Sequence, residues 1–309
     1  MQGIKIIATG RALPQKIVTN DDLSHLVDTS DEWIVTRTGI RQRHFCETET
    51  CQSLAIEAAK RAVEKAQIDK REIGLVIVAT ATPDHLFPSV ACMVQKGLEL
   101  EKEVMAFDLS AACSGFLYGL GVCHSVLLSQ KKKYALLIGS EQMSKILDMS
   151  DRSTCVLFGD GAAAAVITLA EAEFYQKAWS EGNTEALMCR GAGSVDSHIF
   201  MEGSKVFKFA VKAIEEGIEE VLKDSGRNIE DIDYILCHQA NERIIDHVSR
   251  KYKGVTFYKN MDRYANTSAA SIPIALDEMY EKGMLKSGMK IILVGFGAGF
   301  TWSSALLTI

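Results

Sequence analysis

Short apolar runs alternate with amphipathic stretches along the first half of the chain. Residues 74–80 (GLVIVAT) form a β-branched run without polar alternation, which is typical of a strand buried on both faces. Runs of the same character occupy residues 104–109, 134–139 and 162–169. Helical patterns lie between these runs, at residues 54–66, 90–98 and 114–129. The alternation predicts a layered α/β fold.

The second half of the chain repeats this order of elements. A helix predicted over residues 206–223 is followed by a strand at 232–237, as in the first half. Later, MKIILVG resembles the earlier YALLIG, and each is followed by a glycine-bearing turn and a strand of small residues. We therefore predict two related halves, residues 1–170 and 171–309, joined within 170–205. Chemistry is expected at the seam between such halves.

Composition limits the possible functions. Apolar residues make up 47% and charged residues 24% of the 309 positions, as in an ordinary globular protein. The net charge of −6 argues against a nucleic-acid binder but leaves room for a local basic patch. The eight cysteines contain no Cys-x-x-Cys pair and no zinc-ligand spacing, which indicates free thiols in the reducing cytoplasm. We expect neither a signal peptide nor a membrane span.

Cys113 is the strongest candidate for chemistry. It lies in the motif DLSAACSGF, where a predicted strand ends and a helix begins. Unpaired N–H groups and the dipole at a helix start would lower the pKa of a thiol there. The small neighbours of Cys113 would let a substrate carbonyl approach the backbone. A buried structural cysteine in a tight turn fits the same position equally well.

Two polar residues at other element boundaries could act with Cys113. His238 directly follows the strand at 232–237, and sites in α/β proteins lie at the carboxyl ends of strands. Asn266 precedes a helix predicted over 269–282, where its simplest role is to cap the helix. A thiol, an imidazole and an amide together suit a nucleophilic cysteine with two polar partners. Their spacing in the sequence does not show that they meet in space.

Two further patterns have both a structural and a functional interpretation. Residues 295–299 (GFGAG) look like a dinucleotide loop, but the chain then ends in a strand, which favours a turn whose N–H groups line a site. Trp33, close to Arg37, could stack on an adenine while the arginine holds phosphates. Equally, Trp33 could anchor a helix whose N-cap is Thr29 or Ser30.

Together the motifs resemble 3-oxoacyl-[acyl-carrier-protein] synthase III, the family of thiolase-superfamily condensing enzymes that initiate bacterial fatty acid synthesis. The resemblance runs from Ile4 to the C-terminus, and the motifs follow the family's order. They are VDTSDEWIVTRTGI (27–40), FDLSAACSGF (107–116), DRST (151–154), FGDG (158–161), HQAN (238–241) and NTSAAS (266–271).

The resemblance implies a thiolase fold of five layers, α-β-α-β-α, and a homodimer. It implies that Cys113, His238 and Asn266 form a catalytic triad, and that the N–H groups of Cys113 and Gly299 form an oxyanion hole. Cys113 would take an acetyl or other short acyl group from coenzyme A. Malonyl-acyl carrier protein would then lose CO2 and attack the acyl-cysteine in a ping-pong reaction, with no metal or redox cofactor.

The resemblance also implies residues that bind substrates and the partner subunit. Trp33 and Arg152 would hold the coenzyme A adenine between them, and Phe87 would reach into the partner's acyl pocket. The coenzyme A and pantetheine channel would be lined by Thr29, Arg37, Phe207 and Asn241. The basic patch for the acidic acyl carrier protein would consist of Lys208, Arg243 and Arg250. Such a patch suits a net acidic chain, because steering depends on the local field.

Several positions depart from the family's pattern. They are Ala298 within a run of glycines, Ser303 and Ala163 where glycine is common, and Glu242 beside Arg243. Residues 170–205 also look shorter or divergent, which leaves the length of the primer open. Three other functions stay open at this point: a related condensing enzyme with a longer or branched primer or with coenzyme A in place of the carrier protein, a cysteine hydrolase, and a silent scaffold. The Trp33 and HQAN context argues against the hydrolase, and the intact triad argues against the scaffold.

Overall fold

The computed structural model describes residues 2–191, 194 and 196–309, and most of its strands form two five-stranded sheets. In order across the first sheet, the strands are β1 (Gly3–Ala12), β7 (Gly161–Ala170), β6 (Tyr134–Glu141), β4 (Ile73–Ala79) and β5 (Met105–Leu109). Across the second sheet they are β8 (Phe174–Asn183), β14 (Gly299–Thr308), β13 (Lys290–Gly297), β11 (Tyr234–Cys237) and β12 (Thr256–Phe257).

The two sheets repeat one topology. In the first sheet β4 runs parallel to β5 and β6, while β7 lies antiparallel between β6 and β1. In the second sheet β11 runs parallel to β12 and β13, while β14 lies antiparallel between β13 and β8. The strands also follow one another along the chain in the same order. The division into domains at residue 170 stays a prediction.

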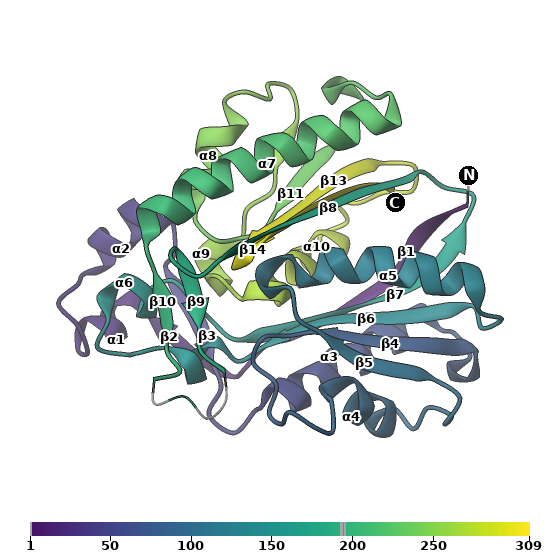
Figure 1. Cartoon of the computed structure of the whole chain (residues 1–309), viewed down its shortest axis with the longest axis horizontal. Coiled ribbons are helices and arrows are strands. Elements are labelled where there is room, and N and C mark those ends of the chain that lie inside the picture. The colour runs from purple at the N-terminus through teal and green to yellow at the C-terminus, as the bar shows by residue number, and fades with distance from the viewer. Residues whose placement is uncertain (1, 192–193, 195) are drawn as a thin grey trace.

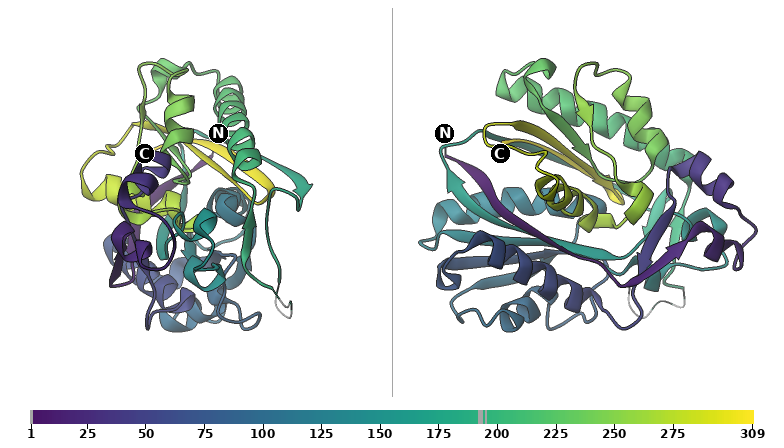
Figure 2. Two further views of the ribbon diagram at one scale, coloured as in Figure 1. Left: turned by 90° about the vertical axis from the view of Figure 1, so that its left-hand side faces the viewer. Right: turned by 180° about the vertical axis from the view of Figure 1, so that it is seen from behind.

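Helices complete five layers, which confirms the predicted α-β-α-β-α fold (Figures 1 and 2). The outer face of the first sheet is covered by α3 (Cys51–Ala66) and α4 (Val90–Gly97), and that of the second by α7 (Gly203–Ser225) and α8 (Glu242–Ser249). The layer between the sheets contains α5 (Gly115–Ser129) and α10 (Ser271–Glu281). Each inner helix is introduced by a 3-10 turn, η2 (Ala112–Ser114) before α5 and η5 (Ser268–Ala270) before α10.

Smaller elements gather at one end of the layers, on the left of Figure 1. There the antiparallel pair of β2 (Lys16–Thr19) and β3 (Gln42–Phe45) lies near the antiparallel pair of β9 (Leu187–Cys189) and β10 (Ile199–Met201). Short helices accompany them: α1 (Asn20–Ser24), α2 (Asp31–Thr38), α6 (Arg152–Cys155) and α9 (Met261–Tyr264). The remaining 3-10 turns are η1 (Lys70–Glu72), η3 (Met143–Ile146) and η4 (Ile229–Asp231).

The apolar runs form the core largely as predicted. Every residue of β4 is buried, and β6 and β7 are buried along most of their length. Burying one branched aliphatic side chain contributes about 1.5–3 kcal/mol, so these strands are a main source of stability. β5 differs from the prediction, because it is an edge strand and no residue in it is fully buried. The edge strands β1 and β8 were not predicted, and β8 lies in the segment expected to join the halves.

The inner helix α5 is long and apolar enough to pass for a membrane span, although none was expected from the sequence. The window Ala112–Ser129 has a mean hydropathy of 1.4 over 18 residues, so by length and composition it could cross a membrane. Half of this window is buried inside the protein, and α5 packs between the two sheets. An apolar surface on several sides is what a helix in a central layer requires.

The central layer is packed by close approaches of backbone, and Gly139 makes one of them. β6 of the first sheet packs against η5, and β13 of the second sheet packs against η2. A Cβ at position 139 would overlap the carbonyl oxygen of Ala269 in η5. Glycine at this position therefore lets the first sheet approach the segment that follows Asn266.

We expect Gly139→Ala to lower the free energy of unfolding by about 1–3 kcal/mol, because the new methyl group must displace backbone. Urea-induced unfolding followed by circular dichroism would measure the change. Gly182→Ala in β8 is the matched control, since a Cβ there meets nothing within 4 Å. Equal stability of the two variants would show that the approach at Gly139 is not tight.

Candidate active site

One cavity brings Cys113, His238 and Asn266 together from both halves of the chain. It has a volume of about 120 Å³, and all three side chains line it. Cys113 lies in η2, His238 directly follows β11, and Asn266 lies between α9 and η5. Most of the other residues that line it are apolar, including Leu157, Phe158, Leu187, Met201, Phe207, Ala240, Ile244 and Phe296. The site can therefore hold a nucleophile and two hydrogen-bonding groups in an apolar setting.

The turn that carries Cys113 is tied to the second sheet. The Ser114 hydroxyl lies 2.8 Å from the carbonyl oxygen of Ala111 and 2.7 Å from Oγ1 of Thr301 in β14. The Thr301 hydroxyl also lies 3.0 Å from the Ala111 carbonyl oxygen. These bonds hold η2 against the glycine turn that joins β13 to β14.

Burial dominates the electrostatics of the nucleophile. Removal from water raises the pKa of the Cys113 thiol to about 12, because a thiolate loses its hydration there. The start of α5 acts in the opposite direction but does not outweigh this loss. The expectation of a lowered pKa is therefore wrong for the free enzyme, and Cys113 rests as a neutral thiol.

His238 is held as a neutral hydrogen-bond donor. Burial lowers the pKa of its imidazole to about 3. Its Nδ1 lies 2.6 Å from the hydroxyl of Ser271, and that hydroxyl accepts a hydrogen bond from the Gln239 N–H at 3.4 Å. Nδ1 is thus engaged with Ser271, and in the tautomer in which the Ser271 hydroxyl donates to Nδ1, the proton of the neutral ring is on Nε2. Nε2 is the nitrogen available to donate to a ligand.

Asn266 lies in the site but is not the helix N-cap considered from the sequence, because the N-caps of η5 and α10 are Thr267 and Ala270, and neither makes a side-chain cap hydrogen bond. Its Oδ1 accepts a hydrogen bond from the Ser268 N–H at 2.9 Å. Its backbone is held in a bridge to Phe158, with Asn266 N donating to Leu157 O at 2.9 Å. Because Oδ1 is engaged with the backbone, Nδ2 is the part of the amide that can donate to a ligand in the cavity.

The glycine turn meets Cys113 through Gly297 in the structure. A Cβ on Gly297 would lie 2.8 Å from the Cys113 nitrogen, whereas a Cβ on Gly299 would meet its own strand at Thr301. Gly297 also lines the cavity, while Gly299 is exposed. The oxyanion role of Gly299 stays a prediction, and Gly297 is the glycine that sequence reasoning missed. A run of closely spaced glycines offers no signal to choose between them.

Trp33 and Arg152, the pair expected to hold the adenine of coenzyme A between them, are in contact with each other in the structure. The Arg37 guanidinium lies 4.4 Å and that of Arg152 4.7 Å from the centre of the Trp33 ring. An adenine between Trp33 and Arg152 needs roughly 7 Å, twice the van der Waals separation of stacked atoms. Arg152 is exposed and donates to the Asp28 carbonyl oxygen at 2.6 Å, and its side chain would have to move aside to admit the adenine. Ser30 caps α2, which confirms one alternative of the capping interpretation.

Buried polar residues, which were not predicted from the sequence, connect the helices that carry Trp33 and Arg152. Arg43 is fully buried and donates to Asn20 Oδ1 at 2.8 Å and to the Val156 carbonyl oxygen at 2.9 Å, at the end of α6. Asn20 in turn donates to Asp31 and Ile40, at the two ends of α2. The helices that carry Trp33 and Arg152 are thus joined through the interior.

Other residues named from the sequence lie around the cavity mouth. Phe207 and Asn241 line the cavity, and the Asn241 amide caps α8 and donates to the Arg37 carbonyl oxygen at 3.1 Å. Thr29 is half-buried, and its hydroxyl finds no partner among the described residues. Outside the cavity the side chains of Lys208, Arg243 and Arg250 are exposed, and none forms an ion pair within the described part of the chain.

Three of the four residues that depart from the family's pattern have structural explanations, whereas Ala298, half-buried in the turn between β13 and β14, has none. Glu242 pairs with Lys259, so its charge is already balanced beside Arg243. The Ser303 hydroxyl donates to the carbonyl oxygen of Lys177 at 2.7 Å. Ala163 is buried in one apolar cluster with Tyr264, Ala270 and Ile274. None of these residues lines the cavity at Cys113.

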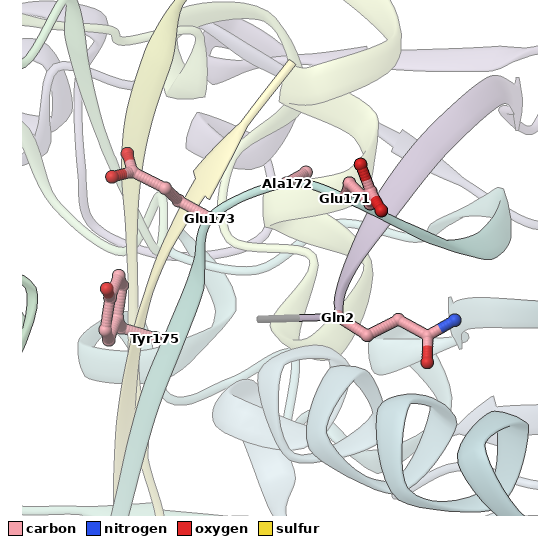
Figure 3. Close-up of a pocket in the computed structure, with 5 residues that line it drawn as sticks. All are labelled: Gln2, Glu171, Ala172, Glu173 and Tyr175. Carbon is pink, nitrogen blue, oxygen red and sulfur yellow. The ribbon is translucent and has the colours of Figure 1, made fainter.

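A separate hollow lies near the N-terminus (Figure 3). It is larger, at about 690 Å³, and is lined by Gln2, Glu171, Ala172, Glu173 and Tyr175. It contains no cysteine or histidine and shares no residue with the cavity at Cys113. The residues that could carry out a reaction therefore line the smaller cavity.

Strained backbone surrounds the site. Ala112, Ala265 and Ser268 have φ values of 44°, 57° and 49°. They lie directly before Cys113, directly before Asn266 and two residues after it. Side chains other than glycine rarely adopt such values, which cost about 1–3 kcal/mol each and cluster at functional sites. For Ala265 the ψ of −158° completes a conformation that is almost restricted to glycine.

Ala265→Gly should therefore raise the free energy of unfolding by about 1 kcal/mol, because glycine adopts this conformation without strain. The measurement is urea-induced unfolding at pH 7. Ala269→Gly, in η5 and without a positive φ, serves as the control and should lose stability. A loss of stability in both variants would mean that position 265 is not strained.

Comparison with known proteins agrees with the fold and the motifs. Family models of 3-oxoacyl-[acyl-carrier-protein (ACP)] synthase III match residues 107–182 and, for its C-terminal part, residues 222–309. Beta-ketoacyl-[acyl-carrier-protein] synthase III of Clostridium beijerinckii is 46% identical and that of Clostridium acetobutylicum 47%, each over 99% of both chains. The crystal structure of 3-oxoacyl-[acyl-carrier-protein] synthase III from Aquifex aeolicus is 44% identical, with a TM-score of 0.94, over 99% of this chain and all of the other. The resemblance is confirmed, and the chain belongs to the 3-oxoacyl-[acyl-carrier-protein] synthase III family of condensing enzymes.

Proposed function

We propose that this enzyme moves an acetyl or other short acyl group from coenzyme A to Cys113 and condenses it with malonyl-acyl carrier protein. The observation that carries the proposal is the cavity shared by Cys113, His238 and Asn266. Its volume of about 120 Å³ and its apolar walls suit a short acyl chain. The products are 3-oxoacyl-acyl carrier protein, coenzyme A and CO2.

In the first half-reaction the Cys113 sulfur attacks the thioester carbonyl of the acyl-CoA. The bond from this carbon to the Cys113 sulfur forms, and the bond to the coenzyme A sulfur breaks. The proton lost by Cys113 leaves with coenzyme A as its thiol, so the step changes no net charge. The developing oxyanion is met by the Cys113 N–H and by the glycine turn at 297–299.

In the second half-reaction His238 and Asn266 act as hydrogen-bond donors. Nε2–H of His238 and Nδ2–H of Asn266 meet the thioester oxygen of the malonyl group as CO2 departs and an enolate forms. The neutral state of His238 suits this role, since it keeps Nε2 a donor without adding a charge. The enolate carbon then attacks the acyl-cysteine, and the Cys113 sulfur leaves. Each step uses side chains and backbone N–H groups, so we propose that no metal or redox cofactor takes part.

We infer that the carrier protein docks on the basic patch at the cavity mouth. Lys208 follows Phe207, and Arg243 lies between Asn241 and Ile244, so these cations adjoin three residues that line the cavity. Their charges, with that of Arg250, are available because no acidic side chain of the described residues pairs with them. An acidic partner would be steered towards the point where its pantetheine must enter. Docking of an acidic carrier protein agrees with our proposal that this enzyme is soluble and cytoplasmic.

We also infer a homodimer formed at the edge of the first sheet. β5 is an unpaired edge strand, and Met105 in it is 55% exposed (Figure 1). Leu86 and Phe87 are 77% and 84% exposed. Bare edge strands and large exposed apolar side chains are unusual unless a partner covers them. Burial of this edge would place Phe87 against the other subunit, where we propose that it closes the acyl pocket.

An acyl-CoA panel tests the proposed reaction. After incubation with acetyl-, propionyl-, isobutyryl- or octanoyl-CoA, peptide mass spectrometry should find an acyl group on Cys113, with acetyl and propionyl the fastest. Addition of malonyl-acyl carrier protein should remove it and give 3-oxoacyl-acyl carrier protein. Labelling only by the longer or branched primers would contradict the short-chain reaction, and steady hydrolysis without the carrier protein would favour a hydrolase.

Cys113→Ser should lose more than about 100-fold in condensation, because its hydroxyl is a much weaker nucleophile. Cys123→Ser in α5 is the matched control, since this buried cysteine lies away from the cavity. Full activity of Cys113→Ser would contradict the assignment of the nucleophile.

Met105→Asp should convert the dimer to monomers in light scattering after gel filtration, because two charges would face each other at the paired edge. Ile7→Asp is the control at the opposite edge of the same sheet, where Ile7 is 37% exposed on β1. A dimer that survives Met105→Asp would place the interface elsewhere.

A further inference from the structure

Arg43 is a buried cation that the proposed reaction does not use. Its side chain is fully buried in β3. Within residues 2–191, 194 and 196–309 its hydrogen bonds all go to neutral oxygens, those of the Val18 and Val156 carbonyl groups and of the Asn20 amide. Burial lowers the pKa of Arg43 to about 10, so the guanidinium stays charged at pH 7. A charge buried in this way destabilises the fold relative to an apolar side chain, so its presence calls for a functional reason.

On one side Arg43 holds α6, the helix that begins with Arg152. Its Nη2 donates at 2.9 Å to the carbonyl oxygen of Val156, the C-cap of α6. This helix has only four residues, and a helix of one turn is not stable by itself. Its position therefore depends on contacts at its two ends. The Asp151 side chain caps the start, and Arg43 binds the end.

On the other side Arg43 holds α2, the helix that carries Trp33, through Asn20. Nη1 of Arg43 donates to Asn20 Oδ1 at 2.8 Å. Asn20 Nδ2 in turn donates at 2.8 Å to Asp31 Oδ1 and at 2.8 Å to the Ile40 carbonyl oxygen. Asp31 begins α2 and Ile40 follows its C-cap, so Asn20 is bonded at both ends of this helix. Asn20 is almost fully buried, so little water competes for these bonds.

The shape of the guanidinium suits this position. Its nitrogens donate in different directions from one rigid plane, whereas a lysine ammonium is a compact point charge at the end of a flexible stem. Apolar packing between α2 and α6 is non-directional, and hydrogen bonds from a charged donor are stronger than those between neutral groups. The bonds of Arg43 therefore set the separation between the backbones that carry Trp33 and Arg152.

We propose that Arg43 is a positioning residue for the nucleotide of coenzyme A. It holds α2 and α6 at the separation at which an adenine fits between Trp33 and Arg152 once the Arg152 side chain moves aside. The inference rests on the proposed function, in which coenzyme A is the acyl donor. Its effect is confined to that donor, because the malonyl group arrives on a carrier protein whose pantetheine arm has no adenine.

The experiment compares two acyl donors in the first half-reaction of the full-length enzyme. Acetyl-CoA carries the nucleotide, and acetyl-pantetheine lacks it. Single-turnover acylation of Cys113, followed by mass spectrometry, gives a half-saturating concentration and a maximal rate for each donor. In Arg43→Lys the half-saturating concentration of acetyl-CoA should rise about fivefold or more, because directional hydrogen bonds are lost while the charge is kept. The value for acetyl-pantetheine and both maximal rates should stay within about twofold of wild type.

Asn20→Ala is the second variant, because it breaks the link to α2 and leaves Arg43 in place. It should raise the half-saturating concentration of acetyl-CoA in the same selective way, and it decides the question if Arg43→Lys does not fold. Thr9→Val in β1 is the matched control. Thr9 is almost fully buried, and its hydroxyl donates to Asp277 at 2.9 Å, away from the cavity. The control should lose stability without changing either half-saturating concentration.

The selectivity between the two donors decides the outcome. Equal rises for both donors would mean that Arg43 supports the whole site, and unchanged values in both variants would mean that α2 and α6 do not need it, so either result overturns the proposal. Trp33→Ala is measured alongside, and an unchanged value for acetyl-CoA there would overturn it as well.

A separate binding measurement keeps this inference apart from the proposed function. If acetyl-CoA does not acylate Cys113 of the wild-type enzyme, the proposed function fails. Adenosine 3′,5′-bisphosphate, the nucleotide part of coenzyme A, then serves as the probe in isothermal titration calorimetry. Its affinity should be about fivefold weaker in Arg43→Lys than in the wild-type enzyme. Equal affinities, or no binding to the wild-type enzyme, would overturn the role of Arg43.

Discussion

The close approach of backbone segments in the central layer is the constraint on which the site depends. Gly139 lets β6 approach η5, and Gly297 lets β13 approach the Cys113 nitrogen. A side chain at either position would push apart the loops that carry Cys113 and Asn266. The cavity exists because two sheets press their carboxyl ends onto one shared layer of helices. The positions of the reacting groups are therefore fixed by the packing of these loops against the sheets.

The same packing decides the charge states in the cavity. Little water reaches Cys113 or His238, so burial favours the neutral form of each. The positive end of α5 is present, but it works against a larger loss of hydration. A donor pair of neutral imidazole and amide stabilises an enolate oxygen more in such a place than in water, because few solvent dipoles compete. The bound substrate must therefore supply the remaining charges and dipoles that the reaction needs.

Much of this could be predicted from the sequence, because apolar runs and motifs are local signals. The strands around residues 74–80, 134–139 and 232–237 were found where the structure has β4, β6 and β11. β8 was missed because its sequence, FYQKAWSEGN, mixes polar and apolar residues on a half-exposed edge. The protonation of Cys113 was mispredicted because a helix start is visible in a sequence and the depth of burial is not. Arg43 was missed for a similar reason, since a single charged residue in a sequence gives no hint of the partners that enclose it.

The repeated topology has a consequence for the origin of the site. Cys113 precedes the inner helix of the first sheet, and Asn266 precedes the equivalent helix of the second. β13 packs beside the former and β6 beside the latter, so each half supports the other's segment. An ancestor consisting of one such unit, paired with a copy of itself about a twofold axis, would have held two identical clefts. Fusion of two such genes would free each copy to diverge, so that a thiol in one half and an amide in the other could form a single asymmetric site.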